Sequence, residues 1–205
     1  MWALINDDNS IKEIIRFPKA LEIEGIKHPR AIFNTWSWEQ LNNIGIYTVE
    51  AGVQGDDKFE ITSNPTYSFN KSKKKVTTAY TTTDKALEDA NAVDDDGNNV
   101  LDADGNQVIN YGLKTIWVKK IKERAYNKLR ETDWYVIRKT EGVDIPASVT
   151  EQRTAIRTDC KTIEDKIIAC KTMTAFKKLF IVPTDDDGNS TGNAPIDDWT
   201  VWNKW

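Results

Sequence analysis

The spacing of apolar residues changes near Gly112, and this change constrains the fold more than any other feature of the 205-residue chain. Upstream, the segment 21–26 alternates apolar and acidic residues with the period of two that a half-buried strand requires. Downstream, apolar residues recur at spacings of three and four and form one stripe along a helix. They are Leu113, Ile116, Trp117, Ile121, Ala125 and Leu129. The sequence therefore predicts an α+β protein with a β-rich N-terminal part and a helical C-terminal part.

Residues 1–83 are expected to form the β-rich N-terminal domain, with one short helix. A hairpin is predicted because the segments 2–5 and 11–17 flank the turn-forming residues 6–9. Ser37 and Gln40 have the spacing of a capping box at a helix start, and Gly45 supplies the residue that ends the helix. Segments rich in β-branched and aromatic residues predict a small antiparallel meander over 46–49, 59–62, 67–70 and 75–81.

Residues 84–111 are expected to form an acidic insertion between the two parts. Two Asp-Gly-Asn triplets, at 96–98 and 104–106, lie eight positions apart and predict a protruding β-hairpin or an ordered loop. A third triplet occupies 187–189. A calcium-binding EF-hand loop needs aspartate at its first position and glycine at its sixth. All three triplets fail this test, because the first positions are Ala92, Val100 and Pro183. An irregular calcium site remains the alternative to a solvated turn.

Residues 112–182 are expected to form the helical C-terminal domain, followed by an extended tail over 183–205. Pro146 suits the first turn of a long helix that reaches about Cys170. Its candidate core face contains Val149, Ile156, Ile163, Ile167 and Ile168. Before it, Thr132 and Asp133 can cap a further helical turn, in which Trp134 and Tyr135 are expected to be core residues. Thr172 can cap a last short helix.

The charges are segregated, although the net charge is only −4. Basic residues concentrate at 71–75 and 114–130, and aspartates concentrate at 94–96, 102–104 and 185–187. The acidic balance argues against nucleic acid as the main partner, although the basic segment 114–130 could contact phosphate. No apolar run approaches the roughly 20 residues that cross a bilayer, so we expect no membrane span. Acidic residues directly after the first apolar residues argue against a secretory signal.

Reaction chemistry has few residues to use in this sequence. His28 is the single histidine, which leaves almost nothing for zinc sites or nucleophile triads. Phosphate-binding glycine loops, nucleophile elbows and paired-cysteine motifs are not found. Cys160 and Cys170 lie about 15 Å apart along a predicted helix, so free thiols are expected. We therefore predict that the chain is not an enzyme and has no catalytic residue, cofactor or metal site.

Three segments of the helical part occur in the order found in a known family. They are Thr132-Asp133-Trp134-Tyr135-Val136-Ile137-Arg138, then Glu141-Gly142 with Ile145-Pro146, then the residues 152–157. This part resembles the C-terminal region of phage tail fibre assembly and tail assembly chaperone-like proteins. The opening Trp2-Ala3-Leu4-Ile5, with residues 41–47, looks like the N-terminal part of phage tail-associated proteins. Together the two likenesses cover about half of the chain.

The resemblance implies a role in building or forming the distal tail. We expect a structural protein of the virion tail, made in the host cytoplasm, that contacts other tail proteins of the fibre, nozzle or baseplate. It is expected to be a homo-oligomer or to be present in several copies. The acidic insertion and the tail after Pro183 favour this over a tail fibre assembly chaperone that leaves the virion, which is the main alternative. A carbohydrate-binding receptor module is a second alternative, because exposed tryptophans stack on sugars.

Five residues are candidates for partner binding. Trp199, Trp202 and Trp205 are spaced along the tail, where they either fold back on the chain's own helices or insert into a neighbouring subunit. The resemblance favours insertion. Arg153 and Arg157 lie four positions apart on one helix face. Pairing with a carboxylate of the neighbouring helix is their simpler role, and binding of a partner is the other.

Overall fold

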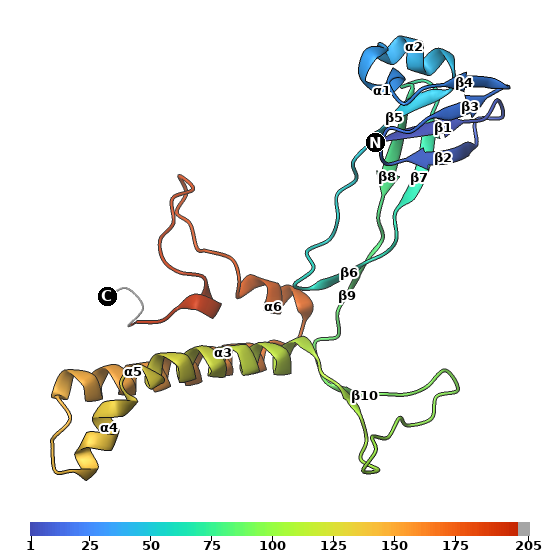
Figure 1. The fold of residues 1–205 in the computed structure, drawn as a ribbon. Coiled ribbons are helices and arrows are strands. Elements are labelled where there is room, and N and C mark those ends of the chain that lie inside the picture. The colour runs from blue at the N-terminus through green and yellow to red at the C-terminus, as the bar shows by residue number, and fades with distance from the viewer. Residues whose placement is uncertain (201–205) are drawn as a thin grey trace. The chain divides into compact units, whose positions relative to one another are not determined.

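The computed structural model describes residues 1–200 and confirms an α+β protein (Figure 1). The chain divides into two compact units, one of which spans Met1–Thr83 while the other begins at Asp84. Strands dominate the first unit and helices dominate the second. The first unit therefore builds its core on a sheet, and the second builds its core on a pair of long helices.

The first unit contains a five-stranded sheet in the order β2-β1-β5-β8-β7. Its strands are β1 (Trp2–Ile5), β2 (Ile11–Ile15), β5 (Ile46–Glu50), β7 (Thr66–Asn70) and β8 (Lys75–Ala79). β1 and β2 form the predicted N-terminal hairpin, in which Trp2 lies opposite Ile15. Neighbouring strands are antiparallel except β5 and β8, which pair in parallel.

The predicted antiparallel meander is therefore right only for its last pair, β7 and β8, although all its strands exist. A meander would pair β5 with the next strand, β6 (Glu60–Thr62), but β6 pairs with β9 (Thr82–Asp84) in a separate two-stranded sheet. The residues 51–74 between β5 and β8 make a crossover of the length that parallel strands need. Strand-forming segments are visible in the local sequence, whereas their pairing depends on residues far apart in the chain.

A second hairpin replaces the single extended segment predicted over residues 21–26. It consists of β3 (Leu21–Ile23) and β4 (Ile26–His28). Glu24 and Gly25, which join the two strands, have φ angles of 50° and 78°. Two successive positive φ angles are typical of a tight two-residue hairpin turn, and glycine adopts such angles without strain. The alternation of apolar and acidic residues in fact breaks at Gly25, and the prediction of one extended segment missed this break.

Two short helices, α1 (Ile32–Thr35) and α2 (Trp38–Asn43), follow this hairpin. The predicted capping box is confirmed at α2. The Ser37 hydroxyl accepts from the Gln40 amide at 3.2 Å, and the side-chain oxygen of Gln40 accepts from the Ser37 amide at 2.8 Å. Gly45 follows with a φ of 76°, as expected of a residue that ends a helix. The sequence pattern does not predict α1, because four residues are too few to show a helical period.

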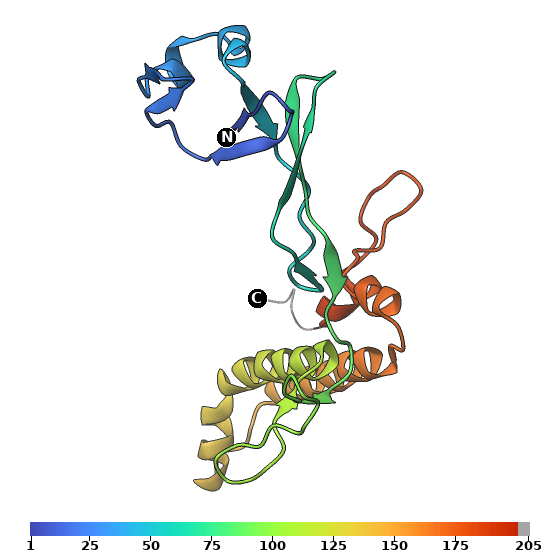
Figure 2. The ribbon, with the colours of Figure 1, turned by 90° about the vertical axis from the view of Figure 1, so that its right-hand side faces the viewer.

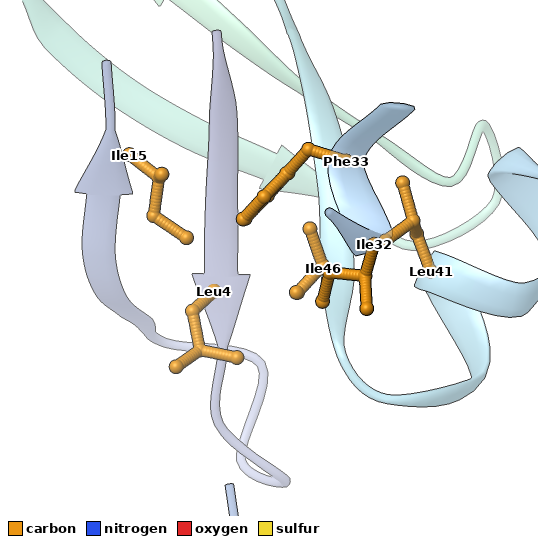
Figure 3. Close-up of a cluster of buried hydrophobic side chains, with 6 residues drawn as sticks. All are labelled: Leu4, Ile15, Ile32, Phe33, Leu41 and Ile46. Carbon is orange, nitrogen blue, oxygen red and sulfur yellow. The ribbon is translucent and has the colours of Figure 1, made fainter. Parts of the chain in front are cut away.

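The core of the first unit lies where the sheet meets these two helices (Figure 3). It consists of Leu4, Ile15, Ile32, Phe33, Leu41 and Ile46. The ring of Trp2 packs beside that of Phe33, with centroids 4.7 Å apart. Each buried side chain of this size contributes roughly 1.5–3 kcal/mol. The hairpin and the helices, which come from different parts of the sequence, are held together by this cluster.

The second unit is built on α3 (Leu113–Arg130) and α5 (Ala147–Ala169), which lie side by side (Figures 1 and 2). α3 buries the residues Leu113, Trp117, Ile121 and Ala125, which are spaced by four. α5 contributes Ile156, Ile163 and Ile167 of its predicted core face. Ile116 and Ile168 were expected on these faces but are 38% and 53% exposed. Each lies one residue beside the buried line, which turns its side chain by about 100° around the helix.

The acidic insertion has the predicted hairpin at its base, where β10 (Ala90–Asn91) pairs with β11 (Ile109–Asn110). Beyond this base it contains two tight turns instead of one, each closed by a single bridge: Val93 with Asn99, and Leu101 with Gln107. The eight-residue spacing of the two Asp-Gly-Asn triplets therefore corresponds to two successive turns. The Gln107 side-chain amide lies among the segments that these turns join, and it donates to the Ala92 carbonyl at 2.9 Å.

Three shorter elements complete the second unit. α4 (Asp133–Thr140) connects α3 to α5. α6 (Met173–Lys178) begins as predicted at Thr172, whose hydroxyl accepts from the Ala175 amide at 3.1 Å. Residues 183–200 were expected to be extended, but they include a turn of 3-10 helix, η1 (Pro195–Asp197), and buried apolar residues.

Candidate functional site

α4 lies at the end of the α3–α5 pair (Figure 1). α3 ends at Arg130 and α5 begins at Ala147, so α4 belongs to the connection between the two long helices. Because the packed faces of α3 and α5 end here, α4 has no long helix along which to bury a face. Its position therefore depends on contacts at its first turn.

Arg153 of α5 provides these contacts. Only 8% of this residue is exposed. One guanidinium nitrogen donates to the Leu129 carbonyl and to the Thr132 hydroxyl, both at 2.7 Å, and another donates to the Asp133 carboxylate at 2.9 Å. The Leu129 carbonyl belongs to the last turn of α3, where carbonyls have no partner within the helix. A cation at this end of α3 is also favoured by the helix dipole.

The same bonds correct the expected role of Thr132. Its hydroxyl makes no capping hydrogen bond to α4. It donates instead to the Leu129 carbonyl at 3.1 Å and accepts from Arg153. Arg153 therefore has the simpler of its two expected contacts, an ion pair with Asp133 of the neighbouring helix. A partner can reach its guanidinium group only by displacing this ion pair and its accompanying hydrogen bonds.

α4 exposes its apolar side chains. No residue of α4 is buried by the part of the chain that the structure describes, and Ile137 is 64% exposed. Trp134 and Val136 are also exposed, and the Trp134 ring stacks on that of Tyr135 with centroids 3.6 Å apart. The expectation that Trp134 and Tyr135 are core residues is therefore wrong. They pack on each other beyond the end of the α3–α5 core, and no second layer of structure within residues 1–200 covers them.

Sequence reasoning missed Val136 and Ile137 as candidate functional residues. The signal was present, because four consecutive apolar residues, 134–137, are more than the single face that a short surface helix can bury. Val143 adds a further exposed side chain just after the helix, where its amide donates to the Arg138 carbonyl at 3.2 Å. We call Trp134, Val136, Ile137 and Val143 the α4 surface.

The C-terminal segment has the opposite arrangement. Trp199 is 3% exposed, and Ala194 and Ile196 beside it are also buried. The Asp159 carboxylate on α5 accepts from both the amide and the hydroxyl of Thr200, at 2.8 and 2.9 Å. These contacts lie within the second unit, so Trp199 is buried by its own chain and does not project from it.

Two ion pairs hold the same segment to the long helices. Arg124 of α3 pairs with Asp197 at 2.5 Å, and Lys166 of α5 pairs with Asp198 at 3.2 Å. Insertion of Trp199 into a neighbouring subunit would require all these contacts to break. The other two tail tryptophans of the sequence prediction, Trp202 and Trp205, lie outside the described residues.

Arg157 is the remaining predicted contact residue. It is exposed on α5, and its guanidinium group donates to the Arg153 carbonyl at 3.4 Å. The two arginines therefore lie together on α5, but their surroundings differ. Arg153 is buried in bonds between helices, whereas the guanidinium group of Arg157 is accessible to a partner.

Within residues 1–200 no three His, Cys, Asp or Glu side chains lie close enough together to hold a metal ion. Cys160 and Cys170 are free thiols, as predicted. Burial raises the pKa of both thiols, so they remain protonated at neutral pH. Among the described residues, no helix combines the length and the apolar character needed to cross a membrane.

Comparisons with known proteins do not assign the chain to a family. No protein-family model matches it, and neither curated proteins nor solved structures give a significant match. The exposed, apolar α4 surface is therefore the structural observation on which a functional proposal can rest.

Proposed function

We propose that this chain is a structural protein of a bacteriophage tail, and that its α4 surface binds another protein of the distal tail, in the fibre, nozzle or baseplate. The exposure of Trp134, Val136 and Ile137 on one short helix carries this proposal. Contiguous apolar side chains left in water often mark the site of a protein partner. Aromatic residues are enriched among those that contribute most to such interfaces.

The residues that carry the resemblance to phage tail proteins are also those that build this surface. Residues 132–138 form α4 and its first contacts, and Arg153, from the last of the three matching segments, bonds to both Thr132 and Asp133. Sequence segments that are separate in the chain therefore act as one structural unit. In this proposal the protein is not an enzyme; it acts through protein contacts, in several copies in the virion.

A pair of isoleucine variants tests the role of the α4 surface. Ile137 and Ile181 are 64% and 61% exposed, so aspartate at either position costs little in the isolated chain. In particles assembled with Ile137→Asp, we expect at least a roughly tenfold loss of this chain, because a charge would be buried at the interface. Ile181→Asp is the matched control and should be retained. Quantitative mass spectrometry of purified particles measures both, and equal retention would contradict the proposal.

The same measurement on unaltered particles distinguishes the main alternative, a tail fibre assembly chaperone that leaves the virion. Presence at a fixed ratio to other tail proteins supports a structural component, and absence supports the chaperone. A chaperone could use the α4 surface too, so co-purification with a tail fibre protein from infected cells would then show the same dependence on Ile137.

A carbohydrate-binding receptor module is the alternative from another class. It needs exposed aromatic rings, and the burial of Trp199 removes one of the tail tryptophans from consideration. Trp134 remains exposed and could stack on a sugar. Glycan binding by the isolated chain that is lost in Trp134→Ala would favour this alternative over a protein interface.

A further inference from the structure

The acidic insertion and α3 carry opposite charges, on surfaces that the proposed α4 contact does not use. Residues 92–108 contain five aspartates and no lysine or arginine. α3 contains seven basic residues and a single glutamate. Both segments belong to the second unit of the chain. Every copy of the protein therefore presents one acidic segment and one helix rich in basic residues.

The basic surface contains an apolar groove. Val118 and Tyr126 of α3 and Ile168 of α5 contribute its apolar lining, between the side chains of Lys114, Lys119 and Lys122. Ile168 is 53% exposed, although it is a large aliphatic residue on a packed helix. Of these lysines, Lys114 and Lys122 pair with Glu88 and Glu164, whereas Lys119 forms no ion pair with any residue that the structure describes. The groove thus offers exposed apolar area beside unpaired positive charge.

The acidic turns have the complementary composition. Asp94 is used inside its turn, where its carboxylate accepts from the Asp96 and Asn98 amides at 3.0 and 2.8 Å. Asp102 is used in the same way in the next turn. Their neighbours Asp95, Asp96 and Asp104 are exposed. Val93 and Leu101, at equivalent positions of the two turns, are also more than half exposed.

The insertion is fixed to the start of α3. The Asp89 carboxylate accepts from the Gly112 amide at 2.7 Å and from the Thr115 hydroxyl at 2.9 Å. A Cβ atom at Gly112 would lie 2.4 Å from the backbone of Glu88, so the two segments are in direct contact there. From this base the acidic turns point away from the rest of α3 (Figure 1). The groove and the turns of one copy therefore do not face each other.

We propose that the α3 groove receives the acidic turns of a second copy of this chain. Val93 and Leu101 would cover the apolar lining of the groove, and the carboxylates of Asp95, Asp96 and Asp104 would face Lys119 and the other lysines beside the groove. Apolar burial stabilises such a contact, while complementary charge orients it and accelerates association. Because the two surfaces are different, each copy can use both of them. Repetition of the contact then gives a closed ring or an open chain of subunits.

Charge-reversal variants of the full-length protein test this contact. The turn variant carries Asp95→Lys, Asp96→Lys and Asp104→Lys, and it retains the two aspartates that hold the turns. The groove variant carries Lys119→Glu. We expect the unaltered protein to self-associate in sedimentation velocity experiments. The association should weaken at least about tenfold when salt is raised from about 50 to about 500 mM. Each variant alone should remain monomeric.

Mixing the two variants gives the decisive result. The lysines of the turn variant can pair with the carboxylate that the groove variant introduces, so the mixture should associate although neither component does so alone. A mixture that stays monomeric would overturn the proposal, as would an unaltered protein that is monomeric at about 100 µM in low salt. Binding of duplex DNA by the groove lysines of the unaltered protein, without self-association, would also overturn it.

The control for this experiment is Ile137→Asp. It alters the α4 surface and should leave self-association unchanged. Loss of the chain from particles with Ile137→Asp, together with normal self-association, would show that the two surfaces act separately. The proposal on self-association can therefore fail without the proposal on the α4 surface failing, and the reverse also holds.

Discussion

α4 and the C-terminal segment 194–200 both meet the α3–α5 helix pair, but α4 exposes its apolar residues whereas the C-terminal segment buries them. α4 is a regular helix of eight residues and has no residue buried within the described chain. The C-terminal segment has only one turn of 3-10 helix, yet Ala194, Ile196 and Trp199 are all buried. Regular secondary structure therefore does not indicate which segment belongs to the core.

The difference comes from the polar contacts that position each segment. Asp159, Arg124 and Lys166 project from the two long helices and bond to residues on both sides of Trp199. α4 is held mainly at its first turn, by Arg153, and the rest of the helix projects beyond the core. The C-terminal segment therefore stabilises the second unit, whereas α4 is available to a partner. Two changes test this division, and a third, with the smallest effect, concerns the acidic turns.

The largest effect is expected at Trp199. Trp199→Ala removes a large buried side chain and should lower the free energy of unfolding by about 3–5 kcal/mol. Trp134→Ala removes the same group from an exposed position and should lower it by less than about 1 kcal/mol. Urea denaturation followed by the helical circular dichroism signal measures both variants. Equal losses would mean that α4 and the C-terminal segment are not different in solution, and would remove the basis of the comparison.

The second effect concerns Arg153. Arg153→Ala removes the hydrogen bonds to the Leu129 carbonyl, the Thr132 hydroxyl and the Asp133 carboxylate at the first turn of α4, and it should cost about 2–3 kcal/mol. Arg157→Ala is the matched control, because this exposed side chain makes a single long hydrogen bond; it should change stability by less than about 0.5 kcal/mol. Hydrogen exchange should also show that α4 loses protection in Arg153→Ala. Unchanged protection of α4 would mean that Arg153 does not position this helix.

The parts of the structure that local interactions determine could be predicted from the sequence. The capping box at Ser37 and Gln40 is formed by residues three positions apart, and the cap at Thr172 is equally local. The buried line of α3 follows from a spacing of four, which is a property of the helix itself. These predictions succeed because nearby residues decide them whatever the rest of the chain does.

The remaining features depend on residues that are far apart in the sequence. The parallel pairing of β5 with β8 joins Val49 to Val76, and nothing local to either strand specifies the partner. The candidate site shows the same limit. Burial of Trp199 depends on the contact of Thr200 with Asp159, and exposure of Trp134 depends on where α3 and α5 end. A tryptophan has the same local signal in both cases, so only the tertiary structure separates a core residue from a surface residue.

The smallest effect concerns the acidic turns, which are neither buried like Trp199 nor apolar like the α4 surface. Hydrogen bonds from Asn98 lower the pKa of the Asp94 carboxyl below its ordinary value of 3.8. Similarly, the backbone hydrogen bond from Asn106 is the largest cause that lowers the pKa of Asp102. A carboxyl with a lowered pKa stabilises the folded turn when it is ionised. This contribution is complete above the ordinary pKa and disappears as the pH falls through the lowered one.

We therefore expect the two turns to loosen below pH 3.8 while they remain unchanged from neutral pH down to that value. The amide resonances of Asn98 and Asn106 report this change in an NMR titration, because both amides donate to the ionised carboxylates at 2.8 Å. Asp94→Asn should abolish the transition at Asn98 and leave that at Asn106 in place. A transition at Asn98 that persists in this variant would mean that protonation elsewhere opens the turn. The acidic turns would then depend on the rest of the second unit, as Trp199 does, and would not be independent local structures.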